Sequence, residues 1–232
     1  MVLIIFLIIG AVVWWYYHET HSYDDTEFVK ECIKEGRNEL QIQSLRFFCN
    51  KTGCLNKVVT FKEYEEVLSL TLQKFDFKKM ALDKIAVDED ELKEIEPIHF
   101  GGYIYDEDSY TKPILSPKDL RVIEGMYSSK YQVSWLFFSA SQVFVYQCTI
   151  NTDKDEIKEN TEEYFYKDIT SFSTASETVE TTQIDKKVKI DVNRLAITVP
   201  GDKFYCTLEQ SDYTEKAING MKSLLRDKKN NG

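Results

Sequence analysis

The stretch YQVSWLFFSASQVFVYQCTI, residues 131–150, contains two alternating apolar runs separated by three small residues. Successive side chains of a β-strand point to opposite faces, so the second run places four apolar side chains on one face: Phe144, Tyr146, Cys148 and Ile150. The connection Ser139-Ala140-Ser141 between two such runs is typical of an antiparallel hairpin. We therefore expect two paired strands here, at the start of a strand-rich region.

The chain beyond this hairpin continues in the same pattern. A charged loop at residues 153–160 is followed by five strand candidates, at residues 162–169, 170–181, 186–192, 194–199 and 203–208. Pro200-Gly201-Asp202 favours a tight turn between the last two strands. With the hairpin, the region then holds seven strands in consecutive order.

The last element is predicted to be an amphipathic helix. Asp212 and Glu215 have the spacing of a capping pair. Apolar residues then recur at helical spacing and form one stripe: Ala217, Ile218, Met221, Leu224 and Leu225. Such a stripe indicates a helix that covers an apolar core.

Upstream, residues 18–97 carry the signals of three or four helices. Thr26 is expected to cap a helix through about Leu40, and its continuation to Phe48 is left open. Thr60 and Glu63 have the capping-box pattern, which recurs at Asp88 and Glu91 before Pro97. Residues 98–125 read as an irregular connector that includes one strand.

The first seventeen residues, MVLIIFLIIGAVVWWYY, contain no charge. As a helix rising ~1.5 Å per residue they would reach about 25 Å, close to the ~30 Å hydrocarbon core of a bilayer. Four aromatic residues at the end of this segment are of the kind that favours the headgroup region: Trp14, Trp15, Tyr16 and Tyr17. We predict a single-pass anchor at residues 1–17 in the cell membrane, with a cytoplasmic body; a cleaved signal peptide and a buried core helix are the alternatives.

Composition excludes several classes of protein. The 232 residues carry a net charge of −10, whereas nucleic-acid binding requires clustered Lys and Arg. Five cysteines are too few for a disulfide scaffold in a chain of this length. We expect a globular protein with no nucleic-acid partner.

Residues 126–229 resemble the pleckstrin-homology-like superfold in the order of seven strands and one terminal helix, and residues 162–174 (EEYFYKDITSFST) are similar to the middle strands of its bacterial members. The resemblance implies a bent antiparallel barrel or sandwich plugged by the C-terminal helix. An unrelated antiparallel sheet backed by a helix is the alternative. The predicted fold class is therefore α+β: an N-terminal transmembrane helix at 1–17, a helical region at 18–97, a connector at 98–125 and a pleckstrin-homology-like domain at 126–229.

The resemblance also implies a use. Phosphoinositide-binding members carry a basic cluster between their first two strands, whereas the corresponding loop here is Ser139-Ala140-Ser141. The nearest basic residues, Lys186, Lys187 and Lys189, are spread over two strand faces, so phosphoinositide binding is disfavoured. The remaining common use is binding of a protein or peptide, often through strand addition at a sheet edge.

Few residue patterns point to chemistry. The candidates are histidines near carboxylates (His18 and His21 beside Glu19, Asp24 and Asp25), a lone His99, a C-x4-C pair (Cys49 and Cys54), two expected core cysteines (Cys148 and Cys206) and the acidic runs 88–91 and 106–108. None matches a catalytic, metal or cofactor motif, and the acidic runs are interpreted as solvated surface. Cys49 and Cys54 could form a disulfide only outside the cytoplasm.

The combined prediction is a membrane-anchored, non-catalytic scaffold that binds a protein or peptide partner and needs no cofactor or metal. Two alternatives stay open. One is an enzyme with its site between the helical region and the β-domain. The other is a structural membrane component that self-associates through its aromatic surface.

Overall fold

The computed structural model describes residues 23–50, 56–87, 89–92, 95–115, 118, 123–183, 186–209 and 211–230. The chain divides into two compact units, which are described separately. The helical unit comprises Met1–Gln73 with Thr152–Lys154, and the β unit comprises Lys74–Asn151 with Asp155–Gly232. The boundary therefore differs from the predicted one at residue 97.

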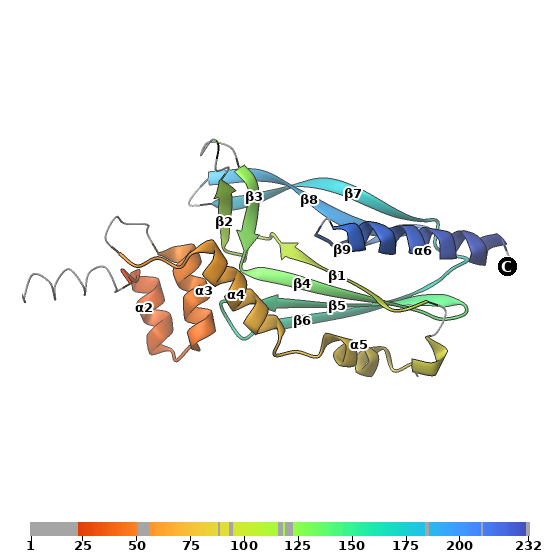
Figure 1. Cartoon of the computed structure of the whole chain (residues 1–232), viewed down its shortest axis with the longest axis horizontal. Coiled ribbons are helices and arrows are strands. Elements are labelled where there is room, and N and C mark those ends of the chain that lie inside the picture. Colours follow the sequence, from red (N-terminus) through yellow and green to blue (C-terminus); the bar gives the residue numbers. More distant parts are fainter. Residues whose placement is uncertain are drawn as a thin grey trace, which may run out of the picture. The chain divides into compact units, whose positions relative to one another are not determined.

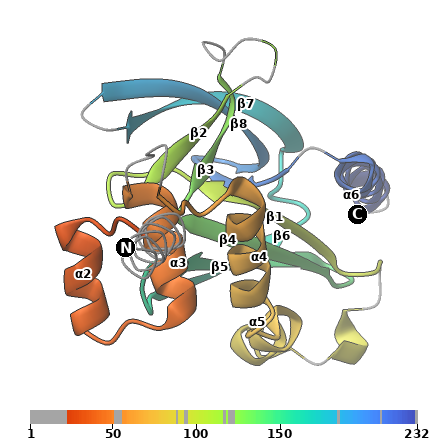
Figure 2. The same ribbon diagram turned by 60° about the vertical axis from the view of Figure 1, so that its left-hand side comes forward.

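The helical unit contains α2 (Glu27–Lys34), α3 (Glu39–Cys49) and α4 (Phe61–Leu72), of which α2 and α3 lie side by side in Figure 2. Thr26 caps α2 by accepting a hydrogen bond from the Val29 amide, as predicted. The helix ends at Lys34, before the predicted Leu40, because Gly36 has a φ of +83° and Asn38 starts α3 with a capping box of its own.

Aromatic packing holds this unit together. The Phe47 ring stacks on the Tyr64 ring, with 4.4 Å between centroids, and Phe48 meets the same tyrosine edge-on. Tyr64 lies on α4, whose predicted capping box at Thr60 and Glu63 is confirmed. Ser44 Oγ lies 2.6 Å and the Tyr64 hydroxyl 3.3 Å from Thr152 Oγ1, so these buried polar side chains are hydrogen-bonded.

The β unit contains two larger antiparallel sheets and one hairpin (Figure 1). The first sheet has the order β1 (Ile98–Ile104), β4 (Lys130–Phe138), β5 (Gln142–Asn151) and β6 (Ile157–Phe165). The second has the order β7 (Ser171–Gln183), β8 (Lys186–Val199) and β9 (Asp202–Thr207). A separate hairpin, β2 (Thr111–Leu115) with β3 (Ile123–Ser128), interrupts the chain between β1 and β4. The fold is thus mixed α+β with antiparallel sheets, as predicted at this level.

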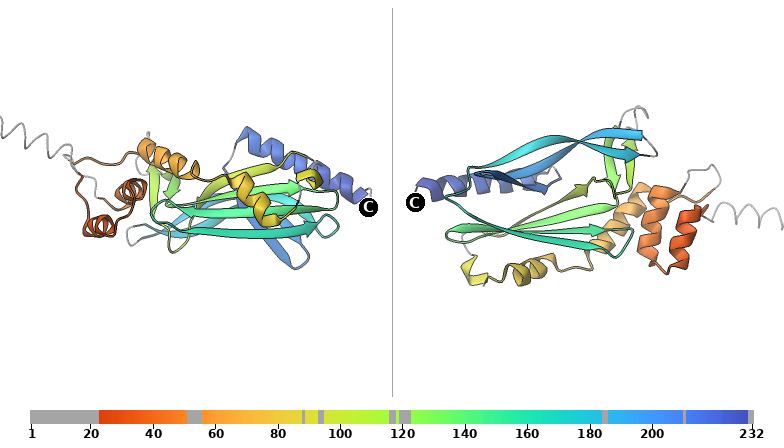
Figure 3. Two further views of the ribbon diagram at one scale, coloured as in Figure 1. Left: turned by 90° about the horizontal axis from the view of Figure 1, so that it is seen from below. Right: turned by 180° about the vertical axis from the view of Figure 1, so that it is seen from behind.

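Three further elements belong to the β unit: α5 (Phe77–Ile85), the short 3-10 helix η1 (Glu89–Glu91) and α6 (Asp212–Asn230). α5 packs against β4 and β5. There the Lys84 ammonium is 3.1 Å from Glu159, which also accepts a hydrogen bond from the Tyr146 hydroxyl at 2.8 Å. Figure 3 shows α6 alongside the long twisted ribbon of β7 and β8.

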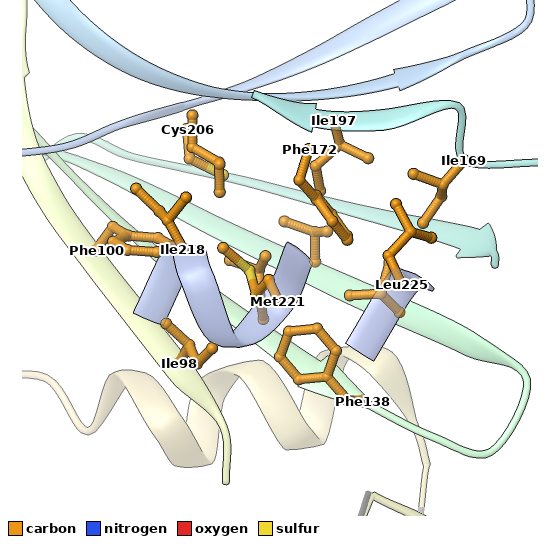
Figure 4. Packing of buried hydrophobic residues seen from close by; sticks show 14 of the residues in the cluster. Ile98, Phe100, Phe138, Ile169, Phe172, Ile197, Cys206, Ile218, Met221 and Leu225 are labelled. Carbon is orange, nitrogen blue, oxygen red and sulfur yellow. The ribbon is translucent and has the colours of Figure 1, made fainter. Parts of the chain in front are cut away.

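The core lies between the two larger sheets and α6, and Figure 4 shows its side chains. The apolar stripe predicted on α6 is confirmed, since Ile218, Met221 and Leu225 are buried in this cluster and Ala217 and Leu224 pack against it. Cys206 lies in the same core, and Cys148 is buried on the opposite face of the first sheet, so both predicted core cysteines are confirmed.

Several predicted elements are different in the structure. Residues 98–125 do not form an irregular connector, because they contain β1, β2 and the start of β3. Residues 186–199 form the single strand β8, with no turn before Arg194. The expected helix ahead of Pro97 is reduced to η1, whereas α5 was not predicted. Seven strands do form the two larger sheets, but β1 replaces one member of the predicted set.

In the part of the chain that the structure describes, no helix is both long and apolar enough to cross a membrane. A bilayer crossing needs about 20 apolar residues, and the longest of these helices, α6, carries charged residues along its length. The predicted localisation, a single-pass protein of the cell membrane with a cytoplasmic body, is contradicted by this finding and is withdrawn. The segment predicted as the anchor, residues 1–17, and its interface residues, Trp14, Trp15, Tyr16 and Tyr17, lie outside the described residues.

Candidate functional site

The β unit contains a groove between the end of β1, the β2–β3 hairpin and β8, with a cavity volume of about 560 Å³. One wall consists of apolar and aromatic side chains: Tyr103, Tyr105, Ile114, Ile123 and Met126. The opposite wall consists of residues 189–193 of β8. The last residue of β9, Thr207, and the two residues after it, Leu208 and Glu209, complete the lining. Ile123 is among the exposed large apolar residues of the molecule. The groove is thus a half-apolar cleft beside a strand.

The strand beside the groove has an open edge. β7 pairs with β8 along its whole length, whereas β9 pairs with it only from Arg194 to Val199. β8 has one side that faces β7 and one that faces β9. Among the described residues, no strand pairs with residues 189–193 on the side that faces β9. We call residues 189–193 the open edge of β8.

The backbone polar groups at this edge can be assigned. The Leu208 amide donates a hydrogen bond to the Asn193 carbonyl oxygen at 3.2 Å, so the backbone of Asn193 faces the side of β9. Backbone direction alternates along an antiparallel strand. The backbone N–H and C=O groups of Lys189 and Asp191 therefore face the groove, while those of Ile190 face β7.

Two glycines of β1 lie near the place where β9 leaves β8. After its last pair with β8 the chain turns to β1, where the Glu209 amide donates to the Gly101 carbonyl oxygen at 2.9 Å. A Cβ atom at Gly102 would lie 2.8 Å from Thr207 Cγ2, and one at Gly101 would lie 2.6 Å from the Tyr131 hydroxyl oxygen. Glycine at these positions permits the close approach of β1 to Thr207 at the end of β9 and to Tyr131 of β4.

The groove has an acidic end. Glu209 accepts a hydrogen bond from the Tyr131 hydroxyl at 3.2 Å. Burial, and secondly the negative charge of Glu209, raise the pKa values of Tyr105 and Tyr131 well above the ordinary tyrosine value. On the open edge, the Asp191 carboxylate accepts from the Thr178 hydroxyl at 2.7 Å, and Lys189 is 3.6 Å from Glu180. The lining therefore favours a cationic group over an anionic one.

A buried polar network lies next to the core, on the inner face of the first sheet. Gln147 Nε2 donates to Gln132 Oε1 at 3.2 Å, to Ser134 Oγ at 3.3 Å and to the Tyr205 carbonyl oxygen at 2.8 Å. Burial raises the pKa of the neighbouring Cys206 thiol to about 12, although hydrogen bonds with Ser134 and Gln147 oppose the shift. This network links the two sheets, and a thiol in it is not a nucleophile at neutral pH.

Among the described residues, no group of three or more histidine, cysteine or carboxylate side chains is placed to hold a metal ion. Asp25 is bound by Arg46, whose guanidinium nitrogens lie 2.9 and 2.8 Å from its two oxygens, and by Asn50 at 2.9 Å. Asp24 accepts a hydrogen bond from Asn56. Glu19 and the two histidines, His18 and His21, lie outside the described residues. His99 stacks on Trp135 at 4.8 Å between centroids.

The other candidates have mixed outcomes. Cys49 is half-buried and Cys54 lies outside the described residues, so their pairing stays a prediction. The acidic run 106–108 is more than solvated surface, because Asp106 binds the buried ammonium of Lys130 at 2.7 Å. The side chains of Lys186 and Lys187 also lie outside the described set.

Sequence patterns missed the open edge of β8 completely. It depends on how far β9 extends along its neighbour, which is a long-range property. The sequence does carry one local signal near this edge, the Gly101-Gly102 pair, which indicates a close backbone approach.

No family model matches the chain, and no curated protein or solved structure matches it significantly. The geometry of the groove and its neighbouring strands is therefore the basis for a functional assignment.

Proposed function

We propose that the β unit is a pleckstrin-homology-like module that binds an extended peptide segment of a partner protein by strand addition to the open edge of β8. The arrangement of a four-stranded sheet, a three-stranded sheet and a terminal helix supports the fold assignment. In this assignment β1 is the first strand and the β2–β3 hairpin is an insertion before the second. The alternatives of an enzyme and of a self-associating component stay predictions.

The observation that carries the proposal is a strand edge with outward backbone groups next to an apolar wall. An added strand would pair with the N–H and C=O groups of Lys189 and Asp191, and these bonds would supply affinity for any extended backbone. Alternate side chains of the peptide would face the groove, where Ile114, Ile123 and Met126 accept apolar groups. Asp191 and Glu209 favour a basic residue nearby.

The same features argue for this edge rather than for the outer edge of β6. The outer strand of the first sheet, β6, has exposed charged residues along its length: Lys158, Glu159 and Glu163. Charged side chains on an edge strand discourage pairing with another chain. The open edge of β8 also carries two charged residues, Lys189 and Asp191, but each is paired with a residue of β7, and an apolar wall lies beside this edge.

The test is selection of linear peptides from a random display library with the whole protein, followed by affinity measurements with Asp191→Pro and Asp191→Ala. Proline removes the groove-facing N–H without removing a β7–β8 hydrogen bond, whereas alanine keeps the N–H and removes only the carboxylate. Loss of this backbone hydrogen bond, which leaves the peptide's carbonyl oxygen without a donor, is expected to weaken binding by about tenfold.

We expect peptides with alternating apolar residues and a basic residue to be enriched, and Asp191→Pro to bind them at least tenfold more weakly than Asp191→Ala. Amide hydrogen exchange at Lys189 and Asp191 should slow when peptide is added. Enrichment of no peptide, or equal affinity of both variants for the enriched peptides, would overturn the proposal.

A further inference from the structure

A second, smaller cavity of about 140 Å³ lies on the inner face of the first sheet, at the end away from α6. Charged and amide side chains dominate its lining: Asp106, Lys130, Gln132, Asn151, Glu156 and Lys158. It shares no lining residue with the groove beside β8. The two are therefore separate cavities, although Ile104 and Asp106 of this one alternate along the chain with Tyr103 and Tyr105 of the groove.

Strand register explains why this end of the sheet is polar. Lys130 pairs with Asn151, and Gln132 with Thr149, across β4 and β5. Further along the same face, Leu136 pairs with Val145 within the apolar core. The inner face thus changes from apolar to polar within the length of two strands.

Lys130 is an unusual residue in this cavity, because its side chain is only 4% exposed. Its Nζ atom lies 2.9 and 2.7 Å from the two carboxylate oxygens of Asp106. A buried ammonium is tolerated only when it is paired. An ammonium has three donors. Both oxygens of Asp106 accept from it, and an oxygen of Asp108 lies 4.0 Å away, beyond hydrogen-bond distance, so Lys130 can bind one more acceptor.

Asn151 is the second unusual residue. It is 8% exposed, and its buried Oδ1 atom has no hydrogen-bond partner among the described residues. Its Nδ2 atom donates to Glu156 Oε2 at 2.7 Å, which fixes the orientation of the amide. Glu156 also pairs with Lys158 at 3.3 Å. A buried acceptor left without a donor is destabilising, and a bound group that donates a hydrogen bond would remove this cost.

We propose that this cavity binds a small zwitterion of the size of a free amino acid. Its ammonium group would donate to Asn151 Oδ1 and Glu156, and its carboxylate would accept from Lys130 and Lys158. The lining holds two cations and two carboxylates, so a ligand without net charge preserves the balance. The volume is several times that of a water molecule, about 30 Å³, and below the range of nucleotide-sized sites.

The experiment uses the whole protein and individual L-amino acids, with methylamine and acetate as separate single-charge probes. Binding is followed by thermal shift and by the side-chain amide signal of Asn151 in nitrogen-15 NMR spectra. We expect at least one amino acid to raise the melting temperature saturably below about 10 mM and to move the Asn151 signal, while methylamine and acetate bind at least tenfold more weakly.

Two variants separate this proposal from the peptide site. Asn151→Leu, similar in size and without the acceptor, should lose at least tenfold in amino-acid affinity and keep its affinity for selected peptides. Asp191→Pro should do the reverse. The NMR signal in the unaltered protein provides a test that does not depend on how the variant folds.

Three results would overturn the proposal. The first is no saturable response to any amino acid, which would mean that the cavity holds only water. The second is equal affinity for methylamine or acetate alone. The third is amino-acid binding that leaves the Asn151 signal in place, because the ligand would then occupy another site.

Discussion

The role of α6 as the cover of the core can be tested at Met221. This side chain is completely buried between the two larger sheets, and the residues that surround it come from both of them and from α6 itself. Met221→Ala removes three heavy atoms from this position. Substitutions of this kind cost 2–5 kcal/mol, depending on how far the neighbours collapse into the cavity. Rigid β-sheets on two sides limit collapse, so we expect a loss of about 3 kcal/mol.

The assay is urea unfolding followed by far-ultraviolet circular dichroism, with Ser223→Ala as the matched control on the exposed side of α6. With a slope near 2 kcal/mol per molar urea, the midpoint of Met221→Ala should fall by about 1.5 M with the slope unchanged. The control should stay within about 0.5 kcal/mol of the parent protein. If both variants have the same urea midpoint as the parent protein, α6 does not cover the core.

Further predictions concern single polar groups. Asp25→Asn should destabilise the helical unit by about 2 kcal/mol at pH 7, measured by thermal unfolding, because Arg46 loses its ionic partner. Burial alone would raise the pKa of Asp25, but hydrogen bonds from Arg46 and Asn50 lower it below its ordinary 3.8, so this stabilisation is present above that value and is lost as pH falls through the lower folded pKa. Tyr146→Phe should cost about 1 kcal/mol at neutral pH and less in acid, because the hydroxyl bonds the ionised Glu159, whose pKa it lowers from 4.5; an unchanged difference at low pH would refute this. Cys206 should react with iodoacetamide only after unfolding, as mass spectrometry of the labelled peptides would show, and rapid native labelling would contradict its burial.

Most local signals in the sequence were accurate, although the capping pattern ahead of Pro97 led only to the short helix η1. Thr26, Thr60 and the hairpin at residues 131–150 act within a few positions of the chain, and the structure confirms each of them. The stripe on α6 was also correct, although Leu224, at its edge, is only partly buried while Met221 is at the centre. Spacing identifies which face of a helix is apolar, but it does not identify the residue that lies deepest.

Long-range features were not predictable in the same way. β1 was hidden by Gly101-Gly102, which weaken a strand pattern and are needed for close contact with Tyr131 and Thr207. The Lys130–Asp106 ion pair joins residues from different elements, and neither residue has a distinctive sequence context. Lys130 and Gln132 do alternate with apolar neighbours at the start of β4, and this alternation could have indicated a polar inner face.

The β2–β3 hairpin has a consequence for how the β unit folds. β4, β5 and β6 follow one another through short turns, whereas β1 must cross the whole hairpin segment before Ile104 can pair with Lys130. Closing a longer loop costs more conformational entropy, so β1 is expected to join a sheet that has already formed. The cost grows only with the logarithm of length, by about 0.6 kcal/mol for each doubling. The hairpin that walls the groove can therefore change in length, and reshape the groove, while the two sheets keep their stability.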